Sequence, residues 1–254
     1  MSFISISASS RAAALVGAAV LLSPAAQADW TGKGEAGLLV SRGNADSTSA
    51  NAKLDLAKES GDWKNAAFVG ILYGKNASFT TAQRIEAKWQ TNYKINDRSF
   101  WFGALHGEQD KFSGFSYQAS VTGGYGYKFI DNEATKLTGT VGVGYRRLRP
   151  ELLNKSDAGE VISRTKLDAS GDAVGTVGLD FSHALTKTTK IVDKLAVESG
   201  SKNTSVQNDL ALQVSMTDAL ALSVGYGVHY NSDPPVGSKR SDQLTTINLV
   251  YNIE

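Results

Sequence analysis

The sequence predicts an all-β protein: a single antiparallel transmembrane β-barrel of about 12 strands, with roughly 10 to 14 permitted. Three observations predict this fold. Apolar residues recur with a period of two along most of the chain. Short turns alternate with more varied and longer connections, which is the layout of an outer-membrane barrel. Aromatic residues gather near both ends of the expected strands, as they do at the two interfaces of a membrane.

The first element is a leader that we expect to be removed. Arg11 precedes an uninterrupted apolar run over residues 12–22, and Ser23, Pro24 and a small-residue pattern ending at Ala28 follow it. A membrane-spanning helix needs about 20 apolar residues, and this run is much shorter. We therefore expect a secretory signal peptide over residues 1–28 and a barrel domain over residues 29–254.

The expected strands alternate along the rest of the chain. In residues 219–230, Leu, Val and Tyr occupy every second position, and the positions between them hold Ala, Ser, Gly and His. Residues 117–129 repeat the pattern. A soluble β-sandwich or a lipocalin also alternates, but its outer face favours Lys, Glu and Thr, whereas small residues suit a crowded barrel interior. The alternation therefore favours apolar faces that point outward toward lipid.

Turn-forming residues divide the chain into about twelve such segments. The short turns are expected at residues 60–62, 96–98, 131–133, 186–189 and 217–218. The longest connections are expected at residues 151–164, 201–203 and 231–240. An even number of strands would place both chain ends on the periplasmic side, beside the short turns.

Two aromatic belts are expected at the ends of these segments. The belt beside the short turns would contain Trp63, Tyr93, Phe129, Phe181 and Tyr251. The belt toward the longer loops would contain Tyr73, Phe112, Phe115, Tyr145 and Tyr230.

Several short Gly-rich motifs carry a family resemblance. They are WTGKGEAG at residues 30–37, Gly43-Asn44, GEQDKFSG at 107–114, GVGYR at 142–146 and NLVY at 248–251. With these motifs the chain resembles the YdiY-like family of salt-induced outer-membrane proteins. The resemblance implies a Gram-negative outer-membrane barrel and brings no known substrate, cofactor or catalytic residue. One departure is the end of the chain, Ile253-Glu254, where such barrels commonly end in an aromatic residue.

Composition and motifs argue against an enzyme. The formal net charge is +1 and Cys is absent, which excludes an electrostatic nucleic-acid binder and thiolate chemistry. His106, Glu108 and Asp110 would share one face of a strand, and Ser182 adjoins His183. The spacing of these residues matches no metal-ligand or nucleophile motif, so we expect no catalytic residue, metal or cofactor.

The charged residues on the polar phase of the strands are the candidates for lining the lumen. Both signs are present, so they could line a narrow aqueous passage or pair across the lumen and close it. Asp193 is different because it falls on the apolar phase, which is tolerable only near the short-turn interface. The candidates are Lys53, Asp55, Arg84, Glu86, Lys88, Lys128, Arg146, Asp168, Asp172 and Asp180.

These inferences predict an outer-membrane protein that acts as a narrow channel or preserves envelope integrity. The resemblance adds a link to salt or osmotic stress. The expected partners are outer-membrane lipid and lipopolysaccharide, the barrel assembly machinery and a small solute, with no nucleic acid. Two alternatives stay open: a structural barrel with a plugged lumen whose loops bind partners, and a barrel-embedded enzyme that hydrolyses lipid or peptide.

Overall fold

The computed structural model describes residues 30–41, 47–76, 79–156, 160–236 and 238–253. The expected signal peptide lies outside these residues. No helix in the described ranges is long and apolar enough to cross a membrane. The strands are β1 (Thr31–Ser41), β2 (Ser47–Ser60), β3 (Trp63–Asn76), β4 (Phe79–Lys94), β5 (Ser99–Asp110), β6 (Phe115–Asp131), β7 (Thr135–Lys155), β8 (Val161–Lys166), β9 (Ser170–Ala184), β10 (Thr189–Gly200), β11 (Thr204–Ser215), β12 (Leu220–Asn231) and β13 (Ser241–Ile253).

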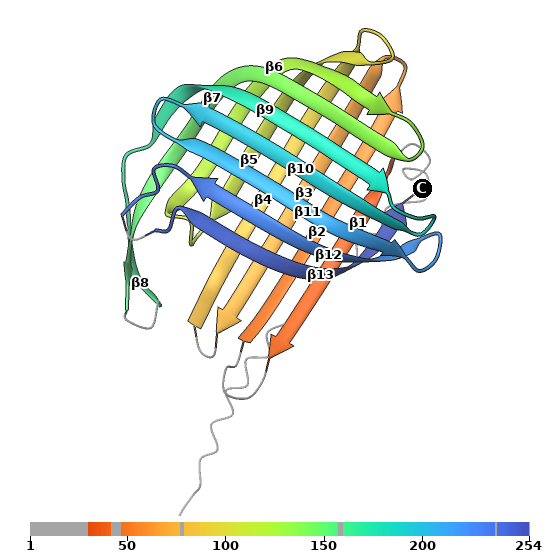
Figure 1. Cartoon of the computed structure of the whole chain (residues 1–254). Coiled ribbons are helices and arrows are strands. Elements are labelled where there is room, and N and C mark those ends of the chain that lie inside the picture. The colour runs from red at the N-terminus through yellow and green to blue at the C-terminus, as the bar shows by residue number, and fades with distance from the viewer. Residues whose placement is uncertain (1–29, 42–46, 77–78, 157–159, 237, 254) are drawn as a thin grey trace, which may run out of the picture.

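All of these strands except β8 form one closed antiparallel ring (Figure 1). Each ring strand pairs with the ring strands next to it in sequence, so that β7 pairs with β9, and β1 pairs with β13 to complete the ring. The ring therefore contains twelve of the thirteen strands that the described residues form. Closure gives every ring strand a hydrogen-bonded neighbour on both sides, as a sheet inside a lipid bilayer requires. The predicted fold class is confirmed.

One expected loop is a hairpin instead. Residues 151–164 were expected to be an irregular connection, but β7 continues to Lys155 and pairs with β8 beyond the barrel. Arg164 on β8 lies over the ring of Phe112, with 5.3 Å between Cζ and the ring centroid, and donates a hydrogen bond to the carbonyl of Lys111. These contacts, which lie outside the ring strands, tie the hairpin to the β5–β6 loop. The alternation ends at Pro150, which made the segment resemble a loop.

The five short turns lie where the sequence placed them, all at one end of the barrel. Side chains close several of them. Asn96 Oδ1 accepts hydrogen bonds from the backbone N–H groups of Arg98 and Ser99 in the β4–β5 turn. In the same turn, a hydrogen bond from Lys94 lowers the pKa of the Asp97 carboxyl below its usual value. Such self-contained turns fix the register of the strands that they join.

The outer face of the ring is apolar. Leu, Ile, Val and aromatic side chains that alternate along the strands are exposed, including Val143 at 73% and Trp101 at 57%. Trp63 and Tyr93 pack beside the short turns with ring centroids 5.0 Å apart. The predicted belt toward the loops was wrong at Phe115, which is only 2% exposed. Phe115 is the register partner of Asp110 on β5 and of Pro150 on β7, at the base of the hairpin.

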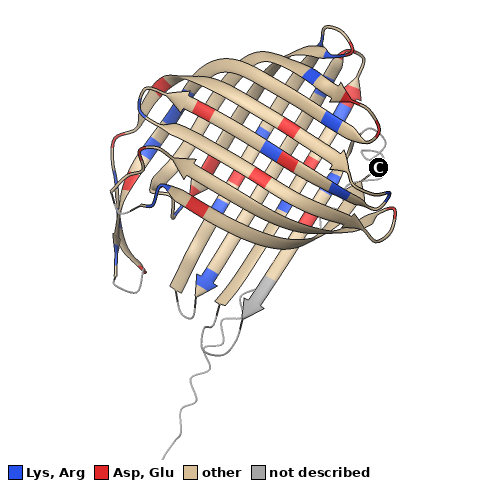
Figure 2. Cartoon of the chain, in the orientation of Figure 1, with Lys and Arg blue, Asp and Glu red and all other residues tan. Residues whose placement is uncertain are grey.

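Polar side chains occupy the inner face, and charged residues occur along the middle of the strands as well as at their ends (Figure 2). The seam between β1 and β13 is an example of polar side chains on the inner face. The β1–β13 ladder is short, running from Gly32↔Ile253 to Ala36↔Leu249. At its end the buried Asn248 donates a hydrogen bond to Glu35, with Nδ2 and Oε2 3.2 Å apart. A buried polar pair thus completes the seam from inside.

Two facing glycines allow β6 and β7 to approach closely. Gly124 and Gly142 are register partners on the inner face. A Cβ atom on Gly124 would collide with the backbone oxygen of Val141, and a Cβ on Gly142 would come within 2.6 Å of the backbone oxygen of Gly123. These glycines therefore make room for the barrel wall itself.

Candidate functional site

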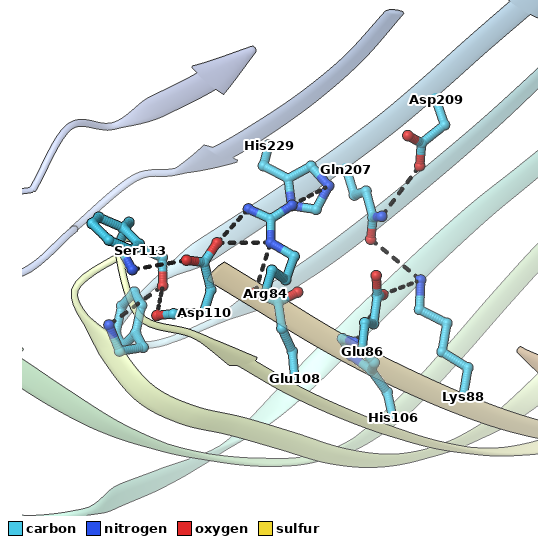
Figure 3. A network of polar contacts seen from close by, with 12 residues as sticks. Arg84, Glu86, Lys88, His106, Glu108, Asp110, Ser113, Gln207, Asp209 and His229 are labelled. Atoms are coloured by element: carbon cyan, nitrogen blue, oxygen red, sulfur yellow. Dashed lines mark hydrogen bonds and ion pairs between the residues drawn. The ribbon is translucent and has the colours of Figure 1, made fainter. Parts of the chain in front are cut away.

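The candidate site is a polar network inside the barrel, formed first by two neighbouring strands. Arg84, Glu86 and Lys88 alternate along β4, so their side chains share its inner face. The β4–β5 register places Asp110 opposite Arg84, Glu108 opposite Glu86 and His106 opposite Lys88. Each cation or anion of β4 therefore has a titratable neighbour one strand away (Figure 3).

Arg84 is the centre of one half of the network. Its Nη2 and Nε lie 2.6 and 2.7 Å from Asp110 Oδ2, and Nε lies 3.9 Å from Glu108 Oε1. Its Nη1 lies 3.3 Å from Nε2 of His229. His229 belongs to β12, which is separated from β4 by four strands on the shorter way around the ring. The Arg84 side chain therefore reaches across the lumen.

Lys88 forms the second crossing. Its Nζ lies 2.7 Å from Glu86 Oε1 and 3.2 Å from Gln207 Oε1, and Gln207 Nε2 donates to Asp209. Gln207 lies on β11, and five strands separate β11 from β4 in both directions around the ring. The hydrogen bond between Lys88 and Gln207 therefore joins opposite walls of the barrel. Lys88 also lies 5.6 Å from the centroid of the Phe68 ring.

A third crossing is more solvated. Lys194 Nζ on β10 lies 3.5 Å from Asp55 Oδ1 on β2, and the two side chains are 51% and 27% exposed. Asp180, on the same inner face of β9, is also exposed, whereas Glu86, Asp110 and Asp172 are buried. The lumen is therefore more accessible beside Lys194 and Asp180 than around Arg84 and Asp110, whose side chains are 14% and 7% exposed.

Arg146 anchors a separate cluster toward the loops. It is 2% exposed, and its Nη2 donates to the backbone oxygen of Asn203 at 2.7 Å. Asp172 and Glu198 supply carboxylate oxygens 3.5 and 3.3 Å from its guanidinium. These partners belong to β9, β10 and the β10–β11 loop, so Arg146 ties that loop to the barrel wall.

Nine of the ten predicted lumen residues lie on ring strands, and six of them take part in the contacts above: Asp55, Arg84, Glu86, Lys88, Arg146 and Asp172. Asp180 lies on the inner face of β9 as the register partner of Lys194. Lys53 lies on β2 opposite Glu35. Lys128 pairs with Asp131 at the short-turn end of β6, with Nζ and Oδ2 3.0 Å apart. Asp168 was misplaced: it is exposed and lies in the connection between β8 and β9, because the hairpin delays the start of β9 to Ser170.

Sequence reasoning missed the partners on the opposite wall. Lys194, Gln207 and His229 complete the three crossings, and none was a candidate. Their strands do alternate, and each residue falls on the polar phase of its strand. Their place on the polar phase was the available signal. Which residues face each other across the lumen depends on the tilt and stagger of the strands, and these cannot be read from one sequence.

The hydrolase pair considered from the sequence is not assembled. Ser182 and His183 are consecutive on β9, so their side chains point to opposite faces. The Nδ1 atom of His183 lies 2.8 Å from Thr135 Oγ1, and its ring stacks on Phe181 with centroids 6.5 Å apart. His106 instead lies beside Glu86, with Nε2 and Oε1 3.1 Å apart.

Comparison with known proteins identifies relatives. The model of the family described as "Protein of unknown function, DUF481" matches residues 34–253. The protein YdiY of Escherichia coli (strain K12), described as uncharacterized, is 24% identical over 235 residues, which cover 90% of this chain and 85% of YdiY. The resemblance to a YdiY-like family is therefore confirmed.

Two solved structures have a backbone similar to that of this chain. The β domain of the Bordetella autotransporter BrkA is 12% identical, with a TM-score of 0.45, and covers 89% of this chain and 98% of its own. The COG4313 outer-membrane channel from Pseudomonas putida F1 is 8% identical, with a TM-score of 0.48, and covers 88% and 95%. At these identities and scores, neither structure transfers a function to this chain.

Proposed function

We propose that this chain, which belongs to the DUF481 family, is an outer-membrane channel whose narrow lumen carries small polar solutes between side chains of both charges. The single observation that carries the proposal is the set of polar contacts that cross the lumen from β4 and β2 to the opposite wall. A solute in that lumen would meet hydrogen-bonding and charged groups on every side. No step of passive passage requires a catalytic residue.

The membrane location follows from the two faces of the sheet. Exposed Leu, Ile, Val, Trp and Tyr side chains cover the outside, and ionised side chains fill the inside. In water this arrangement would expose far more apolar surface than a soluble protein tolerates, whereas lipid tails solvate that surface. We propose lipid and lipopolysaccharide as its surroundings, the barrel assembly machinery as its route of insertion, and the short turns and both chain ends on the periplasmic side.

The crossings also supply a physical link to salt. Lys194 and Asp55 are both partly exposed, so ions in the lumen screen their attraction. The screening length falls from about 10 Å at 0.1 M salt to about 3 Å at 1 M. We propose that this pair lengthens or breaks as ionic strength rises, which would widen the accessible side of the lumen under salt or osmotic stress.

A liposome-swelling assay tests the proposed passage. The barrel is reconstituted into liposomes, and swelling is followed in isosmotic solutions of sugars of increasing size. We expect entry of the smallest sugars only, and an increase for Arg84→Ala, which removes a crossing side chain. Lys128→Ala is the matched control, because Lys128 pairs with Asp131 at the strand end. If neither the wild type nor Arg84→Ala gives swelling, although both are folded in the liposomes, the result would contradict the proposed passage and support a structural barrel with a plugged lumen.

A further inference from the structure

Glu86, His106 and Glu108 form a group with the composition of a metal site. One carboxylate oxygen from each Glu and one nitrogen of His106 all lie within 4.8 Å of one another. Among the described residues, no other group of His, Asp and Glu side chains comes together in this way. Two carboxylates and an imidazole leave an open position for water, as in three-ligand zinc sites.

The contact between Glu86 and His106 shows how two members of this group could share an ion. Their Oε1 and Nε2 atoms are 3.1 Å apart and buried, and neither makes a hydrogen bond of good geometry, although Lys88 Nζ forms an ion pair with the same Glu86 oxygen at 2.7 Å. A neutral imidazole carries a proton on one ring nitrogen and a lone pair on the other. With the proton on Nδ1, Nε2 presents its lone pair beside that of Glu86 Oε1, and a metal ion could accept both. Glu86 is 5% exposed, so water cannot readily separate the two atoms.

The surroundings permit a cation despite two nearby basic groups. Lys88 Nζ forms an ion pair with Glu86 Oε1 at 2.7 Å. If a metal ion displaced it from that oxygen, Lys88 would still have Gln207 and the Phe68 ring as partners. Arg84 is engaged by Asp110 at 2.6 Å and is only loosely in contact with Glu108, at 3.9 Å. Glu108 is therefore free to turn toward an ion. Asp110 and Asp209 add negative charge nearby (Figure 3).

We infer that Glu86, His106 and Glu108 bind a divalent transition-metal ion in the lumen, with Lys88 as a competing internal cation. The imidazole favours zinc, nickel or copper over calcium and magnesium, which prefer sites made of oxygen alone. The bound ion would replace the Lys88 ammonium on Glu86 and would narrow the lumen at this level. This inference is independent of conduction, because binding does not require an open passage.

Isothermal titration calorimetry of the refolded full barrel with zinc chloride tests the inference. We expect one ion per chain and no comparable binding of magnesium chloride. His106→Ala and Glu86→Gln should each weaken zinc binding by at least about tenfold. His183→Ala is the matched control, since His183 contacts Thr135 away from the group and should leave binding unchanged.

The Lys88→Met variant distinguishes a metal site from a polar network that has only a structural role. Removing the competing ammonium should tighten zinc binding, whereas loss of a structural partner would not. Circular dichroism and the heat-dependent gel shift of barrels verify the fold of every variant. Absence of zinc binding to the folded wild-type barrel would overturn the inference, as would equal affinity of wild type, His106→Ala and Glu86→Gln, or weaker binding by Lys88→Met.

Discussion

Lys194 on β10 and Asp55 on β2 meet across the lumen, with Nζ and Oδ1 3.5 Å apart, although four strands separate them on the shorter way around the ring. The pair lies beside the accessible side of the lumen, next to the exposed Asp180. The pair therefore spans the lumen where these side chains are accessible to solvent.

The first prediction concerns the salt dependence of this pair. In wild type, conductance should rise with potassium chloride more steeply than the bulk conductivity does, because screening releases Lys194 from Asp55. Lys194→Ala removes the pair, so its conductance should follow bulk conductivity. Planar-bilayer recordings from about 0.1 M to 1 M salt measure both slopes. Equal slopes for the two proteins would contradict a salt-sensitive crossing.

The second prediction concerns Arg146. Replacing it by Ala leaves the carboxylates of Asp172 and Glu198 facing each other without their cation and frees the carbonyl of Asn203. Removing one partner of a buried charge pair costs about 3 kcal/mol or more of unfolding free energy. Urea unfolding of the refolded barrel in lipid vesicles measures the loss. Arg149→Ala, which removes one exposed hydrogen bond to the carbonyl of Leu167, should change stability by no more than about 0.5 kcal/mol.

A third prediction uses the close approach of β6 and β7. Gly124→Ala places a methyl group against the backbone oxygen of Val141, which cannot move without opening the sheet. We expect a loss of about 1 to 3 kcal/mol, as for other overpacked sites. Gly175→Ala is the control, because a Cβ there meets no atom within 4 Å. Equal stability of the two variants in urea titrations would show that the strands are not packed this closely.

The fourth prediction tests the lipid-facing surface. Asp193 and Asn208 share the outer face, and Asn208 Nδ2 donates to Asp193 Oδ1 at 2.8 Å. Asn208→Ala strips this partner from the carboxylate and should destabilise the barrel in lipid by about 1 kcal/mol. Replacing both residues by Val should stabilise it, because two polar groups leave the lipid-facing surface. Unfolding titrations in lipid vesicles measure the stability of all three proteins. If the double variant is the least stable of them, the result would argue against lipid at this face.

The strands and turns could be predicted from the sequence because they depend on local patterns. Alternation specifies the two faces, and residues such as Asn96 and Gly61 specify the turns. The β7–β8 hairpin was not predicted, since its stability comes from Arg164 and its contacts with Phe112 and Lys111. Those contacts join segments far apart in the chain, where local periodicity carries no information.

The lumen was predictable only in part for a related reason. The polar phase identified Arg84, Glu86 and Lys88, because side chains at alternate positions must share a face. Their partners Gln207 and His229 come from strands that are distant in sequence and are brought opposite by the curvature of the closed ring. The sequence therefore supplies the list of inward groups, and ring geometry decides which of them meet.

Single-channel recording of the Arg84→Ala/Lys88→Ala double variant in planar bilayers tests the central claim most directly. If these side chains cross the lumen of a membrane-spanning channel, wild type should give small discrete conductance steps and the double variant clearly larger ones. Identical steps in the two proteins, or silent bilayers for both although each is folded and inserted, would contradict the account.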